Sequence, residues 1–234
     1  MNHKTGCLVC GRELVYSETT KPIPCFYCGS SHETNASCTD GHFVCDACHS
    51  SSANDLIERF CINTSSTDPI AQAILLMNNP AIKMHGPEHH FLVPAVLLSS
   101  LFTQKPSTPE EKADAIRQAR KRAEDVKGGF CGFHGACGAA IGTGIFVSVL
   151  TGSTPLAKSE WRLSNLMTAG SLEQIAQNDG PRCCKRSSFL AIVSAIEFLE
   201  REFGIEIPAD HQPICTFVAL NKECHGENCS FFQD

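Results

Sequence analysis

Fifteen of the 234 residues are cysteines, and no other feature of the chain restricts its fold as strongly. An odd number of thiols cannot all pair within one chain. Residues 1–20 contain no apolar segment of the kind that a secretory signal needs, so we expect a reducing, cytoplasmic compartment. In such a compartment spaced cysteines bind metal or carry out redox chemistry before they form disulfides. Ten histidines add further metal-ligating side chains.

The cysteines fall into two groups that are separated by a change of composition near residue 50. Residues 1–49 hold seven cysteines and few aliphatic side chains, and apolar helical patterns begin after the serines at 50–52. We therefore expect a metal module of zinc-ribbon type at residues 1–52 and a mainly helical, Cys-rich domain at 53–234. A module with so little apolar surface needs bound metal in order to fold. The predicted fold class is α-rich.

Two Cys-x2-Cys-Gly motifs stand near the N-terminus, Cys7 with Cys10 and Cys25 with Cys28. Two thiolates at this spacing bind one ion at a tight turn, and the following glycine supplies the backbone freedom that the turn needs. Together the two motifs supply four thiolates, which close a tetrahedral shell. We expect a structural zinc site.

A second set of candidate ligands follows directly, with the pattern Cys38-x3-His42-x2-Cys45-x2-Cys48. These four residues suit a second zinc site of the Cys3His type. The ligand pairs could also interleave, with pairs one and three on one ion, as in cross-brace modules of the RING type. A third alternative has one metal site, with the remaining cysteines unligated. The spacing leaves all three arrangements open.

Apolar residues at helical spacing, or N-terminal capping patterns, recur five times in the C-terminal domain. The predicted helix at residues 108–127 opens with a Thr-Pro-Glu-Glu capping box and is charged on most faces, so we expect it at the surface. The predicted helix at residues 187–203 is amphipathic and ends at Gly204. The predicted helices are residues 67–77, 87–101, 108–127, 135–150 and 187–203.

Two of these helices carry unusual residues. Pro94 lacks a donor and should kink or break the second helix. The fourth is apolar all round, which suits a buried central helix, and its glycines at 138, 142 and 144 permit close backbone approach. Only residues 214–220 resemble a strand.

Eight cysteines lie in the C-terminal domain, and we expect Cys61 to be a small buried core residue. Cys131 and Cys137 flank His134 in a glycine-rich loop that leads into the apolar helix. Free amides and the positive end of a helix favour a thiolate or an anionic group there. The alternative is that the glycines serve only packing and both cysteines are core residues.

Cys183 and Cys184 are adjacent, and three cations flank them in the sequence Pro-Arg-Cys-Cys-Lys-Arg. Neighbouring cations lower thiol pKa values, although the same cations could form a solvated face. Adjacent cysteines rarely ligate one ion together. We therefore expect one of them to ligate or react, and the other to pack or to serve a second role.

The C-terminal tail carries three more cysteines in a segment rich in Gly and Asn, beside His225. Three thiolates from the tail and one from the earlier pairs would complete a four-thiolate site for zinc or for an iron–sulfur cluster. The expected cofactor ligands are Cys131, Cys137, Cys183, Cys215, Cys224 and Cys229.

Histidines are concentrated in the segment His85-Gly-Pro-Glu88-His89-His90. A zinc-hydrolase helix needs Glu directly after its first His, and glycine and proline stand there instead. The histidines could hold a catalytic metal, or His89 could face the Cys-Gly loop as a general acid or base or as a substrate contact. A helix start or a surface role is the third alternative. The candidate catalytic residues are His89, His134 and Cys184.

The segment Phe133-His134-Gly135-Ala136-Cys137-Gly138 resembles the Phe-His-Gly-x-Cys element of proteins similar to the E-type component of formylmethanofuran dehydrogenase. It also resembles the Gly-Cys-Ala-x-x-Gly signature of a family described as redox-active. Ala136 stands where the first family has a second His, and Ala-Cys-Gly-Ala replaces Gly-Cys-Ala. The whole chain resembles an uncharacterised prokaryotic family of Cys-rich proteins found beside methyltransferase or radical enzymes. These resemblances imply metal-linked redox chemistry and a redox, methyltransferase or radical-enzyme protein partner.

Three functional hypotheses follow, and they include enzymatic and non-enzymatic alternatives. The leading one is structural zinc in the N-terminal module with an iron–sulfur cluster that serves electron or sulfur transfer. The second is an iron–sulfur Lewis-acid lyase or hydro-lyase, and the third a zinc interaction protein or metallochaperone. A net charge of -6 argues against a general nucleic-acid binder, and no apolar run reaches the length of a membrane span.

Overall fold

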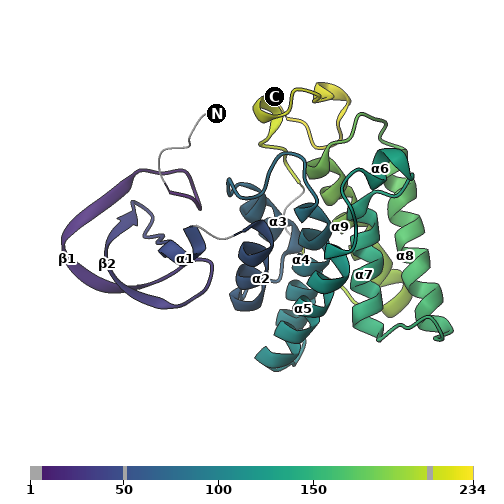
Figure 1. The fold of residues 1–234 in the computed structure, drawn as a ribbon, viewed down its shortest axis with the longest axis horizontal. Coiled ribbons are helices and arrows are strands. Elements are labelled where there is room, and N and C mark those ends of the chain that lie inside the picture. Colours follow the sequence, from purple (N-terminus) through teal and green to yellow (C-terminus); the bar gives the residue numbers. More distant parts are fainter. Residues whose placement is uncertain (1–6, 50–51, 210–212, 234) are drawn as a thin grey trace.

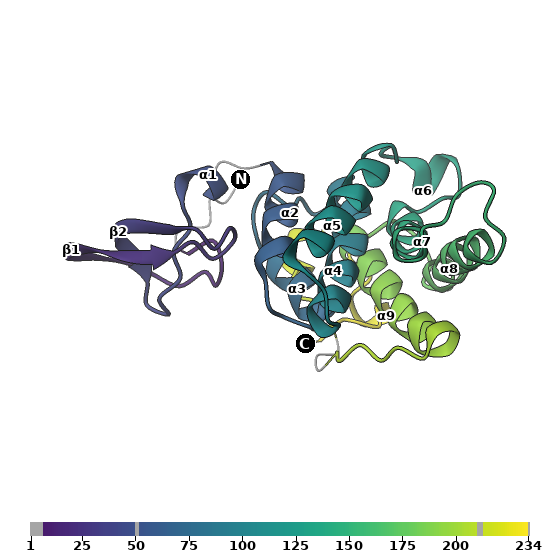
Figure 2. The same ribbon diagram turned by 90° about the horizontal axis from the view of Figure 1, so that it is seen from below.

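The computed structural model describes residues 7–49, 52–209 and 213–233. A small β-containing part with the first seven cysteines lies on one side, and helices form the remainder (Figures 1 and 2). The predicted α-rich fold with a small N-terminal module is therefore confirmed. Ser50 and Ser51, at the predicted junction, lie outside the described residues.

The N-terminal part is built on one antiparallel pair of strands, β1 (Leu14–Pro24) and β2 (Ser31–Cys38). Leu14 pairs with Cys38 at one end and Pro24 with Ser31 at the other. A short helix, α1 (Asp46–His49), follows. Most side chains of β1 are exposed, so the sheet builds no apolar core of its own.

The helical part contains every predicted helix and adds three others, α2, α6 and α8. Short 3-10 turns occupy the C-terminal tail. The helices are α2 (Ala53–Asn63), α3 (Pro69–Met77), α4 (Glu88–Gln104), α5 (Pro109–Glu124), α6 (Phe130–Phe133), α7 (Gly138–Thr151), α8 (Ser159–Ala176) and α9 (Cys184–Phe203).

Local capping chemistry explains where several helices begin and end. The Asp68 carboxylate accepts hydrogen bonds from the first amides of α3. Thr108 and Glu111 form both hydrogen bonds of the predicted capping box at the start of α5. Gly204 ends α9 in the left-handed conformation, with φ of 63°. These side-chain and glycine caps satisfy backbone groups that a helix end leaves free.

Helix α4 lies at the centre of the helical part, and its residues from Glu88 to Leu101 are buried except at His90. The helix continues through Pro94, so the alternative that Pro94 breaks it is wrong. Packing keeps α4 helical through Pro94, because α4 is enclosed by α2, α3, α5, α7 and α9. A Cβ added at Gly142 of α7 would lie only 2.9 Å from the His90 carbonyl oxygen and from Pro94 Cδ. Glycine therefore permits the close approach of α7, as predicted.

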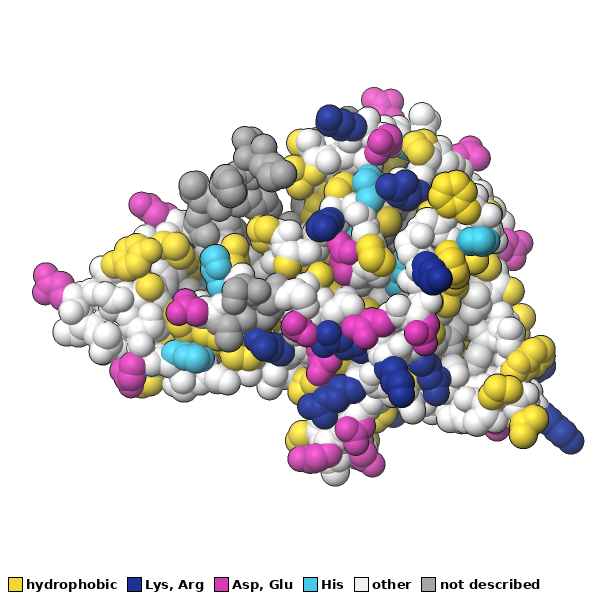
Figure 3. All heavy atoms as spheres, in the orientation of Figure 1, with side chains coloured by type: hydrophobic (Ala, Val, Ile, Leu, Met, Phe, Trp, Pro, Cys, Tyr) yellow, Lys and Arg dark blue, Asp and Glu magenta, His cyan; other side chains and the backbone are white. Residues whose placement is uncertain are grey.

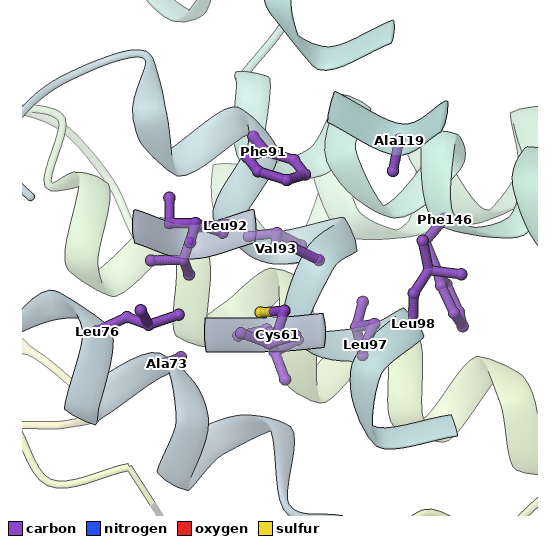
Figure 4. Close-up of a cluster of buried hydrophobic side chains, with 14 of the residues drawn as sticks. Cys61, Ala73, Leu76, Phe91, Leu92, Val93, Leu97, Leu98, Ala119 and Phe146 are labelled. Atoms are coloured by element: carbon purple, nitrogen blue, oxygen red, sulfur yellow. The ribbon is translucent and has the colours of Figure 1, made fainter. Parts of the chain in front are cut away.

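Cys61 is fully buried among aliphatic side chains of α3 and α4, as expected of a small core residue (Figure 4). The Ser99 hydroxyl donates to the Cys61 carbonyl at 2.8 Å. The Cys61 thiol is remote from water, and burial raises its pKa. Cys61 is thus separate from the other C-terminal cysteines in position and in environment.

The predicted strand at residues 214–220 is wrong. The segment is irregular and ends in a 3-10 turn at Val218–Leu220. A strand needs a partner, and the only sheet in the described residues is the β1–β2 pair. Phe217 is instead buried against the ammonium group of Lys185. None of the helices in the described part of the chain combines the length and apolar character that crossing a bilayer requires.

Candidate metal centres

The N-terminal part brings together a first group of four ligands, Cys7, Cys10, Cys38 and His42, with ligand atoms all within 4.8 Å of one another. The Cys10 and Cys38 sulfurs are 3.8 Å apart, and Cys38 Sγ lies 3.4 Å from His42 Nδ1. The Val9 amide donates to Cys7 Sγ at 3.4 Å, and the His42 amide donates to Cys38 Sγ at 3.3 Å. Such amides stabilise a thiolate.

A second group contains Cys25, Cys28, Cys45 and Cys48, and its sulfurs meet the same distance limit. Cys28 and Cys45 sulfurs are 3.9 Å apart. The Cys45 amide donates to Cys25 Sγ at 3.4 Å, and Arg59 Nη1 donates to Cys48 Sγ at 3.6 Å. Each group could therefore hold one metal ion.

The ligand pairs interleave, with pairs one and three in one group and pairs two and four in the other. The hairpin explains this arrangement. Cys38, at the end of β2, pairs with Leu14 at the start of β1, and this brings the third ligand pair beside Cys7 and Cys10. Of the three arrangements that the spacing allows, the structure has the cross-brace.

In the second group hydrogen bonds from Ser30 lower the pKa of Cys28 to about 6, but without a cation the other thiols resist a second negative charge beside it. Burial and the neighbouring thiols raise the pKa of Cys48 to about 12, and burial also raises the pKa of Cys45. A bound divalent cation reverses this preference, because it stabilises the thiolates that coordinate it.

Tyr27 anchors the N-terminal part to the helices. Its side chain is fully buried, and its hydroxyl donates to the Leu8 carbonyl at 3.3 Å. The same oxygen accepts from Asn79 Nδ2, beyond the end of α3, at 2.9 Å. The ring of Phe60 in α2 packs edge-on against Tyr27, with centroids 6.3 Å apart. Metal ligands and helices are thus linked through one side chain.

In the C-terminal domain, four cysteines line a small cavity of about 20 Å³ at the start of α9. Cys183 is the N-cap residue of α9, and its sulfur accepts from the Arg186 amide at 3.5 Å. Burial raises the pKa of Cys215, and the charges of the other three thiols add to the effect. The four are Cys183, Cys215, Cys224 and Cys229.

The tail that carries three of these cysteines is held by a few specific contacts. The Cys215 amide donates to the Phe231 carbonyl at 2.8 Å, and Phe231 packs edge-on against Phe189 at 5.4 Å. The Gly226 amide donates to Cys224 Sγ at 3.4 Å, the same relation as Val9 to Cys7. Figure 1 shows the tail (yellow) crossing the top of the helical part.

The remaining three cysteines line a second, larger cavity of about 610 Å³. Cys131 lies in α6, Cys137 is the N-cap residue of α7, and Cys184 is the first residue of α9. Burial raises the pKa of Cys184 to about 11, while the Gly86 amide acts in the opposite direction by hydrogen bonding. The chain thus divides its seven non-core C-terminal cysteines into a group of four and a group of three.

Two neighbouring histidines also line the larger cavity. His89 Nδ1 lies 3.1 Å from the Gly86 carbonyl, and His90 Nδ1 lies 3.0 Å from the Val126 carbonyl. Both Nδ1 atoms must be donors, because a carbonyl only accepts, and this leaves each Nε2 as a lone pair. Burial lowers the pKa of His89 well below its ordinary value, so its imidazole is neutral.

His134 lies outside the wall of this cavity. It is exposed at the C-terminal end of α6, where its ring contacts Phe130 with centroids 4.7 Å apart. His85 is also outside the wall and lies 3.4 Å from a Glu223 carboxylate oxygen. Of the predicted acid–base and nucleophilic residues, the structure brings His89 and Cys184 to one cavity and leaves His134 apart.

Two of the three cations that flank the adjacent cysteines, Lys185 and Arg186, are buried, so a solvated face is wrong for them. Lys185 Nζ donates to the Met77 and Ile82 carbonyls at 3.4 Å, and burial lowers its pKa to about 8. Arg186 lines both C-terminal cavities and donates to His225 Nδ1 at 2.8 Å. The guanidinium thus separates the two thiol groups.

Comparison with known protein families finds one match, which covers residues 57–232 and is described as a family of unknown function, DUF5714. The matched region contains both C-terminal thiol groups and Cys61, and the eight N-terminal ligands precede it. Neither the curated proteins nor the solved structures contain a match to the chain.

Proposed function

The chain belongs to DUF5714, a family of unknown function, and we propose from the geometry that it is an iron–sulfur protein with a zinc-folded N-terminal module. The cluster bound by Cys183, Cys215, Cys224 and Cys229 serves electron transfer. One observation carries the proposal: four thiols line one cavity at the start of α9, yet among the described residues no three of their sulfurs lie within 4.8 Å of one another.

Zinc suits the two N-terminal groups by distance and by donor type. Zn–S bonds of about 2.3 Å in a tetrahedron put two sulfurs about 3.8 Å apart. The sulfur pairs at 3.8 and 3.9 Å match that separation. Both groups supply four protein ligands, which leaves no open position, so the zinc ions have a structural role.

Spacing argues for a different cofactor in the tail. Among the described residues, no three of the four sulfurs of this group lie within 4.8 Å of one another. A single zinc ion would draw them to that range, whereas a cluster of several iron atoms holds its thiolates further apart. The Gly226 and Arg186 amides donate to two of the sulfurs, which is the interaction that tunes cluster potentials.

Electron transfer suits a site with four thiolates because all its iron positions are then filled by protein ligands. The neighbouring cavity of about 610 Å³ lies on the other side of Arg186. An electron that enters the cluster from a redox partner protein therefore has a short route to a molecule bound in that cavity. A methyltransferase or radical enzyme would be such a partner.

The test is metal and sulfide analysis of the full chain, purified and reconstituted without oxygen. We expect about two zinc ions per chain and iron with acid-labile sulfide. Serine substitution of the four proposed cluster ligands together should remove about four of the iron ions and leave zinc unchanged. A matched Cys61→Ser variant should keep all the metal. Zinc in place of iron at these four cysteines would refute the proposal.

A further inference from the structure

The larger cavity has the size of a small-molecule site, and its three thiols are not ligands of the proposed electron-transfer cluster. Its volume of about 610 Å³ lies within the usual range of roughly 300–1,000 Å³ for ligand pockets. It forms where α6, the end of α8 and the first turns of α7 and α9 meet. Three thiols from three separate elements face it, which are Cys131, Cys137 and Cys184.

Two buried polar atoms in this wall have no hydrogen-bond partner among the described residues. His89 is 1% exposed, and its Nε2 lone pair is unpartnered. Arg186 is 6% exposed, and its Nε–H is likewise unpartnered. Buried polar groups are nearly always paired, so both atoms have hydrogen-bonding capacity left for a bound water or ligand. One is an acceptor and the other a cationic donor.

The start of α7 adds further unpaired donors. Cys137 is its N-cap residue and makes no side-chain capping hydrogen bond, and Gly138 and Ala139 also line the cavity. The N-terminus of a helix of this length attracts an anion through its free amides and its dipole. Arg182 and Arg186 outnumber Asp179, the one carboxylate of the wall, so the cavity favours negative charge.

We propose that this cavity is a second metal site, in which Cys131, Cys137 and Cys184 hold an iron–sulfur cluster whose fourth iron position is open to a small anionic ligand. Three thiolates fill three of the four positions that such a cluster offers. Within the described residues these three thiols and His89 are not gathered within 4.8 Å, which excludes a preformed site for one zinc ion. A cluster is itself anionic and suits the α7 N-terminus.

An open iron position would supply an electron-pair acceptor for a small ligand, and His89 of the same cavity wall would supply a proton acceptor. The Gly86 carbonyl accepts from His89 Nδ1–H, so Nε2 is the nitrogen that keeps a free lone pair. This site shares no ligand with the tail cluster. The two assignments can therefore fail separately.

The experiment compares three full-length proteins after anaerobic reconstitution: wild type, the triple variant C131S/C137S/C184S, and the quadruple variant C183S/C215S/C224S/C229S. We expect about eight iron ions in the wild type and about four in each variant. Zinc content and helicity should match in all three, which controls for folding.

Cyanide, a small anion that binds open iron positions, then serves as the probe. Adding it should change the electron paramagnetic resonance spectrum of the reduced wild type and quadruple variant, and leave the triple variant unchanged. The proposal is overturned if the triple variant keeps all its iron, or if cyanide alters no spectrum. If the quadruple variant keeps all the iron of the wild type while the triple variant loses all of it, the cavity site stands and the tail cluster falls.

Discussion

Cys183 and Cys184 are adjacent in the chain, yet their side chains line two different cavities. The start of α9 causes this division. Cys183 has extended backbone geometry as the N-cap residue, with φ of -131°, and Cys184 is already helical. One helix start therefore contributes a thiol to each C-terminal group, and the two sites meet at this peptide bond.

This relationship predicts different outcomes for two neighbouring serine substitutions. Serine is itself a favoured N-cap, so Cys183→Ser keeps a side-chain acceptor for the Arg186 amide while it removes a soft metal ligand. We expect iron loss and faster proteolysis of residues 213–233. Cys184→Ser should leave that segment protected. Equal cleavage rates in the two variants would contradict the division.

The cross-brace predicts which cysteine pairs share an ion. Cys10 and Cys38 sulfurs lie 3.8 Å apart in one group, whereas Cys28 belongs to the other. The double variant C10S/C38S should therefore keep about one zinc ion per chain, and C10S/C28S should lose both. Zinc released to a colorimetric chelator gives the count. If C10S/C28S kept one zinc ion and C10S/C38S lost both, each ion would instead be bound by two consecutive ligand pairs.

The hydrogen bond between Tyr27 and Asn79 should contribute measurably to stability, because both groups are buried. Tyr27→Phe removes the acceptor of Asn79 Nδ2 and leaves that amide unsatisfied. We expect a loss of about 1–2 kcal/mol in the free energy of unfolding, measured in urea. Tyr16→Phe is the matched control, since Tyr16 is 69% exposed, and should change little.

Arg120 joins α5 to α2 and gives stability a defined pH dependence. It forms ion pairs with Asp55 at 2.9 Å, with Glu58 at 2.9 Å and with Glu124 at 2.8 Å. Charged side chains of both signs are interspersed over this region in Figure 3. The Ser52 hydroxyl and Arg120 hold the pKa of Asp55 below 3.8, and Arg120 holds that of Glu124 below 4.5.

A carboxyl group whose pKa is lower in the folded than in the unfolded state stabilises the fold at any pH above its unfolded pKa. That stabilisation is lost as the pH falls through the folded pKa. Arg120→Gln should therefore cost about 1 kcal/mol near neutral pH, since the carboxylates are partly exposed. The difference from wild type should shrink as the pH falls below about 4.5. Arg117→Gln, at a side chain 58% exposed, is the control. A pH-independent difference would assign the role of Arg120 to packing.

Local sequence signals predicted those parts of the fold that local chemistry determines. The capping box at Thr108 and the terminal Gly204 act within one helical turn, so both were readable. The strand at residues 214–220 failed because β structure depends on a distant partner. Helix α8 was missed because it buries few residues, which leaves no clear apolar period.

The metal-ligand groups, too, depend on contacts between residues that are distant in the sequence. The sequence contained all the ligands of the N-terminal groups, but their pairing depends on the hairpin that brings Cys38 to Cys10. The burial of Lys185 did have a local signal. Lys185 stands four residues before Phe189 and continues the apolar stripe of α9, which indicates burial for a cation. The division of Cys183 from Cys184 follows from helix geometry that composition does not reveal.

Two glycine-to-alanine substitutions in different helices should change stability in opposite directions. A Cβ at Gly138 would lie 2.1 Å from the His90 ring, so the ring must move, and we expect a cost of about 1–3 kcal/mol. At Gly170 in α8 nothing lies within 4 Å of an added Cβ. Alanine there should stabilise by about 0.5–1 kcal/mol, because it reduces the freedom of the unfolded chain. Urea denaturation measures both, and a neutral Gly138→Ala would show that His90 is not held against α7.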